Sequence, residues 1–142
     1  MKIAVDTNVL VRAVVYDDPR QARIAGGVLR HASNIVVGLS CLCELAWVLK
    51  RVYAFSPAKI SAAIRLLFDA ANVDMNRPAV EAGLAMLDAG GDFADGIIAA
   101  EGRWMGGETF VSFDRQAVSR LAAQRHSARL LDALPTKSRR PH

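Results

Sequence analysis

Short apolar runs alternate along the chain with longer segments in which apolar residues recur at helical spacing. Residues 2–5 lack the polar–apolar alternation of a half-exposed strand, which indicates a strand buried on both faces. Leu10, Ala13 and Val14 then lie three to four residues apart, as on one face of a helix. The same reasoning predicts further strands over residues 34–39, 73–75, 109–112 and 129–132, one helix after residue 39, and further helices over residues 19–32, 57–70, 77–89, 92–105 and 115–124.

Turn and capping residues separate these segments. Ser56-Pro57 has the form of an N-cap followed by a proline at the first helical position, and two Gly-Gly pairs, at residues 90–91 and 106–107, end helices. Short strands that alternate with helices indicate a parallel sheet covered by helices. The predicted fold is an α/β/α sandwich with a central parallel sheet of four to five short strands. Residues 1–134 form one domain without repeats or linkers, and residues 135–142 form a basic tail that we expect to be disordered.

Composition narrows the class of protein further. The 142 residues are 52% hydrophobic and 23% charged, which is typical of a globular domain. Met1-Lys2 leads directly into the first strand, no signal peptide is recognisable, and no apolar run reaches the roughly 20 residues of a membrane span. Cys41 and Cys43 point to different sides of a helix, so we expect free thiols in a cytoplasmic protein. The net charge of +4 permits a polyanionic partner.

Several acids lie where parallel strands end or where the next helix begins. Asp6 directly follows the first strand, and Asp114 follows the fourth after one residue. Asp95 lies in the first turn of the 92–105 helix, and Glu44 lies in the first turns of the helix after the second strand. Because the functional crevice of an open parallel sheet lies beyond the carboxyl ends of its strands, we expect these four side chains to converge.

Each acid also has a purely structural interpretation. Asp6, Asp92 and Asp114 could be N-caps that accept hydrogen bonds from helix amides. Glu44 has Ser40, Cys41, Trp47 and Val48 as its helical neighbours, so the sequence predicts at least partial burial. An ion pair with Arg12 or Lys50 could then compensate its charge.

Taken together, the four acids indicate a metal site. Convergent carboxylates repel one another and raise one another's pKa values unless a cation is present. All-oxygen ligation suits Mg²⁺ or Mn²⁺ rather than zinc. Such a site orients a phosphate and lowers the pKa of a bound water, so hydrolysis of a phosphodiester is the natural chemistry.

The ordered motifs "VDTNVL", "CELAWVL", "DFADGIIAA" and "FVSFDR" resemble those of PIN-domain nucleases, most closely the VapC-type toxins of bacterial toxin–antitoxin pairs. The resemblance extends over residues 1 to about 134. It implies that Asp6, Glu44, Asp95 and Asp114 are the metal-binding and catalytic acids. It also implies supporting roles for Asn8 beside the first aspartate, for Ser112 near the last, and for Asp92.

The resemblance further implies an activity and partners. Family members are endoribonucleases that use Mg²⁺ or Mn²⁺ to activate water and leave 5′-phosphate and 3′-hydroxyl ends. They usually form homodimers and are held inactive by a small cognate antitoxin, which here would be VapB-like. One departure is Gly96, where alanine is more usual; glycine could loosen the start of its helix by up to about 1 kcal/mol.

Basic residues suggest where RNA would bind. Arg12 and Lys50 lie on helices that start near the acids, and Arg115 follows the last acid directly. Phosphate contacts of this kind would make affinity dependent on salt. Two other interpretations stay open: a catalytically silent PIN-like module that binds RNA or protein, and a phosphotransferase that uses Asp6 as its nucleophile, although a second-aspartate DxD pattern and a paired lysine are missing.

Overall fold

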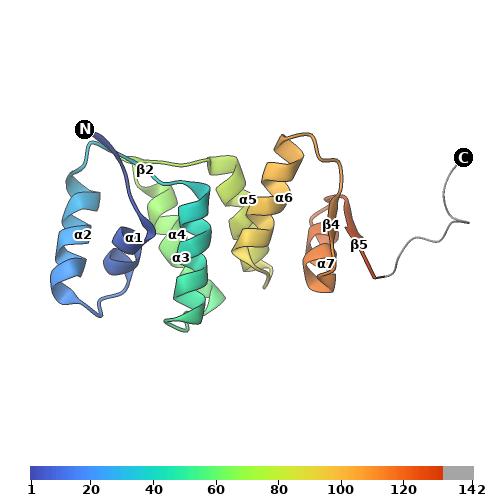
Figure 1. Cartoon of the computed structure of the whole chain (residues 1–142), viewed down its shortest axis with the longest axis horizontal. Coiled ribbons are helices and arrows are strands. Elements are labelled where there is room, and N and C mark those ends of the chain that lie inside the picture. Colours follow the sequence, from blue (N-terminus) through green and yellow to red (C-terminus); the bar gives the residue numbers. More distant parts are fainter. Residues whose placement is uncertain (133–142) are drawn as a thin grey trace, which may run out of the picture.

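The computed structural model describes residues 1–132, over which it contains five strands and seven helices (Figure 1). The predicted basic tail at residues 135–142, with the last two residues of the predicted domain, lies outside the described part. The strands are β1 (Lys2–Ala4), β2 (Asn34–Val36), β3 (Val73–Asp74), β4 (Phe110–Ser112) and β5 (Ala128–Leu130). The helices are α1 (Thr7–Val14), α2 (Pro19–His31), α3 (Leu39–Arg51), α4 (Pro57–Asp69), α5 (Arg77–Asp88), α6 (Phe93–Trp104) and α7 (Arg115–Ala123).

Capping side chains and prolines determine where several helices begin. Asp18 accepts a hydrogen bond from the third amide of α2, and Pro19 occupies the first position of that helix. Ser56 caps α4 in the same way and is followed by Pro57 at the first position of that helix, and Asn76 caps α5. Proline at this position loses no helical hydrogen bond, because the first amides of a helix have no partner within it. These local signals explain why the predicted helix starts agree closely with the observed ones.

The strands are parallel wherever they pair, which confirms the α/β class. They form two sheets, however, rather than the one central sheet expected from the sequence: a three-stranded sheet in the order β1-β2-β3 and a two-stranded sheet of β4 and β5. In Figure 1, α5 and α6 lie between the two sheets, so β1 and β4 are separated by a pair of helices. The sheet edge that the sequence predicted to be continuous is therefore divided.

Two hydrophobic clusters correspond to this division. The larger cluster packs the β1-β2-β3 sheet with α1, α3, α4, α5 and α6. A smaller cluster joins Leu121 of α7 to Met86 of α5 and Ala99 of α6, with Phe110 and Ala128 packed against it. We call residues 110–130, which comprise β4, α7 and β5, the C-terminal unit. The smaller cluster fastens this unit to the α5–α6 pair on the side away from the larger sheet (Figure 1).

Helices α5 and α6 approach closely because small residues face each other at their contact. A Cβ atom added to Gly96 would lie 2.5 Å from the carbonyl oxygen of Ala82 and 2.8 Å from the Cα atom of Gly83. Ordinary van der Waals contacts of a Cβ atom lie at 3.4–4 Å. Glycine at position 96 is therefore required by packing, which answers why alanine is absent there.

The end of α2 is tied to the loop before β3. The Nδ2 group of Asn72 donates hydrogen bonds to the carbonyl oxygens of Leu29, at 2.9 Å, and Ala32, at 3.0 Å. Leu29 lies in the last turn of α2 and Ala32 is its C-cap, where carbonyl groups have no helical partner. Within residues 1–132, no helix is long and apolar enough to cross a membrane.

Candidate metal centre

Asp6 lies at the carboxyl end of β1, where the chain enters α1. Its carboxylate caps α1 and accepts a hydrogen bond from the backbone N–H of Thr7 at 2.7 Å. Thr7 itself is buried and donates from its hydroxyl to Cys41 Sγ of α3 at 3.6 Å, while that thiol points to the carbonyl oxygen of Val5 at 3.8 Å. The Thr7–Cys41 contact therefore holds the end of β1 against α3, which also carries Glu44.

Glu44 is exposed, so the predicted burial of its carboxylate is wrong. Its helical neighbour Trp47 is also exposed, at 59%, whereas Cys41 and Val48 on the same face are half-buried. Ion pairs between residues 1 and 132 do not include Glu44, so the predicted pairing with Arg12 or Lys50 is not observed. An exposed carboxylate keeps its hydration and needs no buried partner.

Arg12 has a different partner from the one suggested by the sequence. Its Nη1 atom lies 2.8 Å from Oδ1 of Asp17, and the hydroxyl of Tyr53 donates to the other oxygen of Asp17 at 2.8 Å. The hydrogen bond from Tyr53, then that from Arg12, lowers the pKa of Asp17 below its ordinary value. Arg12 thus links α1 to the loop before α2.

A second group of acids lies at the start of α6 and α7. Asp92 caps α6 by accepting from the N–H of Ala94 at 3.3 Å. Asp95 is half-buried, and its pKa is raised by this burial and by the nearby charges of Asp92 and Asp114. Unlike Glu44, Asp95 is therefore a carboxylate whose surroundings disfavour its charged form.

Asp114 combines a capping role with this acidic surrounding. Its Oδ1 atom accepts from the backbone amides of Gln116 at 3.0 Å and Ala117 at 3.1 Å, which caps α7. Ser112, the predicted supporting hydroxyl, accepts from the backbone N–H of Asp114 at 2.9 Å. Ser112 therefore fixes the backbone from which the Asp114 carboxylate projects.

The acids thus form two groups in one chain. Asp6 and Glu44 are both close enough to Cys41 that their charges add to the effect of burial in raising the pKa of its thiol. Asp95 lies with Asp92 and Asp114. Among residues 1–132, no group of three or more His, Cys, Asp or Glu residues is placed to hold a metal ion.

The donor chemistry fits a divalent cation even though one chain does not complete the site. Carboxylate oxygens are the ligands that Mg²⁺ and Mn²⁺ prefer. Repulsion at Asp95 would also be relieved by a cation. A single chain in this conformation, however, offers the cation two separate sets of carboxylates. The assignment of Asp6, Glu44, Asp95 and Asp114 as ligands stays a prediction.

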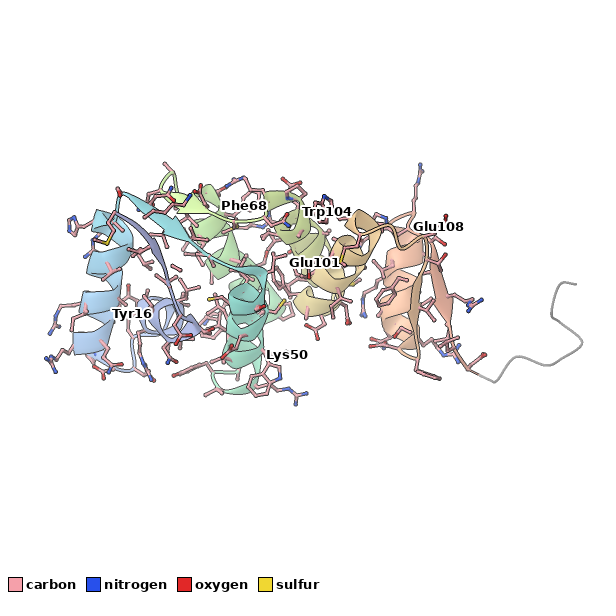
Figure 2. The ribbon with its side chains drawn as sticks, turned by 45° about the horizontal axis from the view of Figure 1, so that its top comes forward. Tyr16, Lys50, Phe68, Glu101, Trp104 and Glu108 are labelled. Atoms are coloured by element: carbon pink, nitrogen blue, oxygen red, sulfur yellow. The ribbon has the colours of Figure 1, made fainter. Side chains whose placement is uncertain are left out.

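Within residues 1–132, the side chains of the remaining predicted residues make no hydrogen bond or ion pair with the acids. Asn8 is exposed on α1, and the carboxylate of Asp6 uses the amide of Thr7 rather than Asn8 among its described partners. Lys50 is exposed on α3 and lines a hollow of about 220 Å³ that also includes Asp92. Figure 2 shows Lys50 at the far end of α3 from its start. Arg115 is exposed at the first position of α7.

Sequence reasoning missed the contact between Thr7 and Cys41. Thr7 follows the strand-end aspartate directly, and Cys41 stands three residues before Glu44, so both lie beside predicted acids. Helical spacing could have indicated that Cys41 and Glu44 share a face of α3. It could not have indicated that Thr7 reaches that face, because this depends on how α1 packs on α3.

Comparisons with known proteins support the motifs independently. The family model described as the PIN domain matches residues 3–124, which is most of the chain. A search of curated proteins found no match.

Proposed function

Because the chain belongs to the PIN-domain family, whose members are mostly metal-dependent nucleases, we propose that it is an Mg²⁺- or Mn²⁺-dependent endoribonuclease. We further propose that it is the toxin of a VapC-type toxin–antitoxin pair. The proposed metal ligands are Asp6, Glu44, Asp95 and Asp114. When bound, the cation would lower the pKa of a water molecule and stabilise charge on the phosphate oxygens.

The observation that carries this proposal is the surrounding of Asp95. A half-buried carboxylate near two other carboxylates is costly for the folded protein, because burial and repulsion both disfavour its charged form. Proteins keep such arrangements where a group has a task that requires a perturbed pKa or a cation. The position of Asp95, in the motif "DFADGIIAA" of a PIN domain, makes metal binding the task that fits best.

Basic side chains beside the acids support a nucleic-acid substrate. Arg115 is adjacent to Asp114, and it lines a shallow hollow with Arg120. Lys50 shares a hollow with Asp92. Cations placed here would hold the phosphates that flank the bond to be cleaved, with an affinity that falls as salt rises.

An apolar groove on α1 and α2 supports an antitoxin partner. Val9 on α1 and Ile24 and Val28 on α2 line a hollow of about 360 Å³, and the side chain of Ile24 is 57% exposed. Arg12 borders the same hollow. An amphipathic segment of a small antitoxin would cover these apolar side chains, and it would lie partly on α1, the helix that Asp6 caps.

Cleavage of total cellular RNA by the purified chain tests the nuclease proposal. We expect discrete products with Mg²⁺ or Mn²⁺, none with EDTA, and none with Asp6→Asn, Glu44→Gln or Asp95→Asn. Asp18→Asn is the matched control, because Asp18 caps α2 as an ordinary N-cap and has no proposed role in the chemistry. Loss of cleavage in Asp18→Asn as well would mean that the substitutions act through folding.

The second candidate function is a catalytically silent PIN-like module that binds RNA or protein. It is favoured by the absence, within residues 1–132 of one chain, of three acids close enough to hold a metal. RNA that is bound but not cleaved, by a folded sample free of antitoxin, would establish this second function. Binding that survives Asp95→Asn unchanged would agree with it.

A further inference from the structure

Within residues 1–132, each sheet has two edge strands, and the two that lead into predicted metal ligands are β1, which ends before Asp6, and β4, which ends before Asp114. Strand β1 pairs with β2 on one side, and Lys2 and Ala4 on it are exposed. Strand β4 pairs with β5 on one side, and Val111 at its centre is 44% exposed. Figure 1 places the two edges on opposite sides of the α5–α6 pair.

The free edge of β4 has peptide groups available for another strand. Phe110 donates its N–H to Ser127, and Ser112 accepts from Leu131, so both residues bond toward the β5 side. Because successive peptide groups of a strand point in opposite directions, those of Val111 point away from β5. The segment from Phe110 to Phe113 is uncharged, and the side chain of Phe113 is 79% exposed. An edge of this kind is a ready template for a further strand.

The C-terminal unit cannot bring its own β4 to β1 without leaving the helices that hold it. Leu121 packs on Met86 and Ala99, and Nε of Arg120 donates to the carbonyl oxygen of Ala89 at 3.1 Å. Figure 2 labels Trp104 at the end of α6 and Glu108 near the C-terminal unit, so residues 105–109 connect α6 to that unit. While these contacts persist, the strand that can reach β1 belongs to another molecule.

We propose that this other molecule is a second copy of the chain, and that β4 of each copy adds in parallel to β1 of the other. A two-fold axis makes both contacts identical, so the pairing closes on itself and leaves neither edge free. Each completed sheet has the order β3-β2-β1 from one copy followed by β4-β5 from the other.

The exchange completes the divided acid site. In parallel strands that are neighbours, the carboxyl ends lie at the same edge of the sheet. Asp114 of one copy then lies near Asp6 and Glu44 of the other, and it brings Asp95 and Asp92 of its own copy with it. The part of this inference that concerns catalysis rests on the proposed nuclease function. The strand pairing does not.

Crosslinking between two differently tagged chains tests the pairing directly. One chain carries Ala4→Cys and the other Val111→Cys, both at exposed positions on the two free edges, and the chains are co-expressed and treated with a short bifunctional thiol reagent. The two native cysteines, Cys41 and Cys43, are not expected to interfere with this crosslinking. Burial raises the pKa of Cys43 to about 11 and also raises that of Cys41, so both react slowly at neutral pH.

The exchange predicts a crosslinked heterodimer from the mixed pair, and none from either single variant or from the wild type. A product that forms only when both substitutions are in one chain, and that keeps the mass of a monomer, would show that the sheet closes within one molecule and would overturn the proposal. Failure of every combination to crosslink would overturn it too. A monomeric mass for the wild type in solution, at all concentrations tested, would do the same.

Complementation tests the shared site. Asp6→Asn and Asp114→Asn chains are each expected to be inactive alone, with folding preserved because asparagine caps helices nearly as well as aspartate. In a mixed exchanged dimer, one site carries both substitutions and the other carries neither. Random pairing therefore restores about a quarter of the wild-type cleavage rate.

No recovery, from a wild type that does cleave RNA, would refute the shared site. If the wild type itself does not cleave, the proposed function fails. The crosslinking result then still decides whether the strands are exchanged, so the two failures are distinguishable.

Discussion

Replacing Gly96 with alanine tests how closely α5 and α6 pack beneath the candidate site. Alanine has the higher helix propensity, by about 1 kcal/mol, so a helix on its own would gain stability. In the folded protein the added methyl group would meet the carbonyl oxygen of Ala82 at 2.5 Å and the Cβ atom of Met86 at 2.9 Å. Helix propensity therefore predicts that this substitution stabilises the protein, whereas packing predicts that it destabilises the protein.

The magnitude follows from what the methyl group meets. A contact of 2.5 Å must lengthen by about an ångström to become ordinary, and the neighbour is backbone, which cannot rotate away as a side chain would. Overpacking of a tight core costs about 1–3 kcal/mol, and the backbone contact puts Gly96→Ala at the upper end. After the gain in propensity, we expect a net destabilisation of about 2 kcal/mol, or roughly 6–10 °C in Tm for a domain of this size.

Urea and thermal unfolding measure this difference, and Gly102→Ala provides a matched control. Gly102 lies in the same helix with nothing within 4 Å of an added Cβ atom, so its replacement should raise stability by up to about 1 kcal/mol. Gly96→Ala is thus predicted to lower the free energy of unfolding, and Gly102→Ala to raise it. Equal or greater stability of Gly96→Ala relative to the wild type would refute the close packing of α5 on α6.

Three further predictions concern charges and hydrogen bonds. Asp95→Asn removes a half-buried charge that faces other carboxylates, so with EDTA at neutral pH its Tm should exceed that of the wild type; a lower Tm would contradict the repulsion. Asn72→Ala leaves two carbonyls of α2 without their donor and should cost about 1–3 kcal/mol in urea unfolding, whereas an unchanged midpoint would show that water replaces the amide. Hydrogen bonds from Tyr53, then from Arg12, lower the pKa of Asp17 below its ordinary value of 3.8. The ionised carboxylate therefore stabilises the fold at pH values above 3.8, and this stabilisation is lost as the pH falls through the lowered pKa. Unfolding of Asp17→Asn should therefore depend less on pH than that of the wild type between neutral pH and pH values below 3.8, and parallel profiles would argue against this assignment.

Local signals in the sequence were sufficient to place the elements. Ser56 and Pro57 predicted the start of α4 because capping and proline geometry act within one helical turn. The strand-end positions of Asp6 and Asp114 were predicted for the same reason, since a short apolar run and the first polar residue after it define them. The proximity of Asp95 to Asp92 follows from their spacing in one helix start.

Features that depend on distant parts of the chain could not be predicted in this way. The apolar neighbours of Glu44 identify one face of α3, but they do not say whether another element covers it, and Trp47 on that face is exposed. The partner of Arg12 is Asp17, in a loop whose path no periodicity encodes. The division into two sheets depends on whether β4 packs beside β1 or beyond α6, and both arrangements have the same pattern of apolar residues.

The capping roles of three acids have an evolutionary consequence. Asp6, Asp92 and Asp114 each hold a helix start in this structure, and asparagine can do the same. A single base change converts an aspartate codon into an asparagine codon. Such a change at one of these positions would remove a carboxylate of the proposed metal site while keeping the helix cap, so the folded chain would still present the same surfaces. Loss of the proposed activity would then leave a stable, inactive chain rather than an unfolded product.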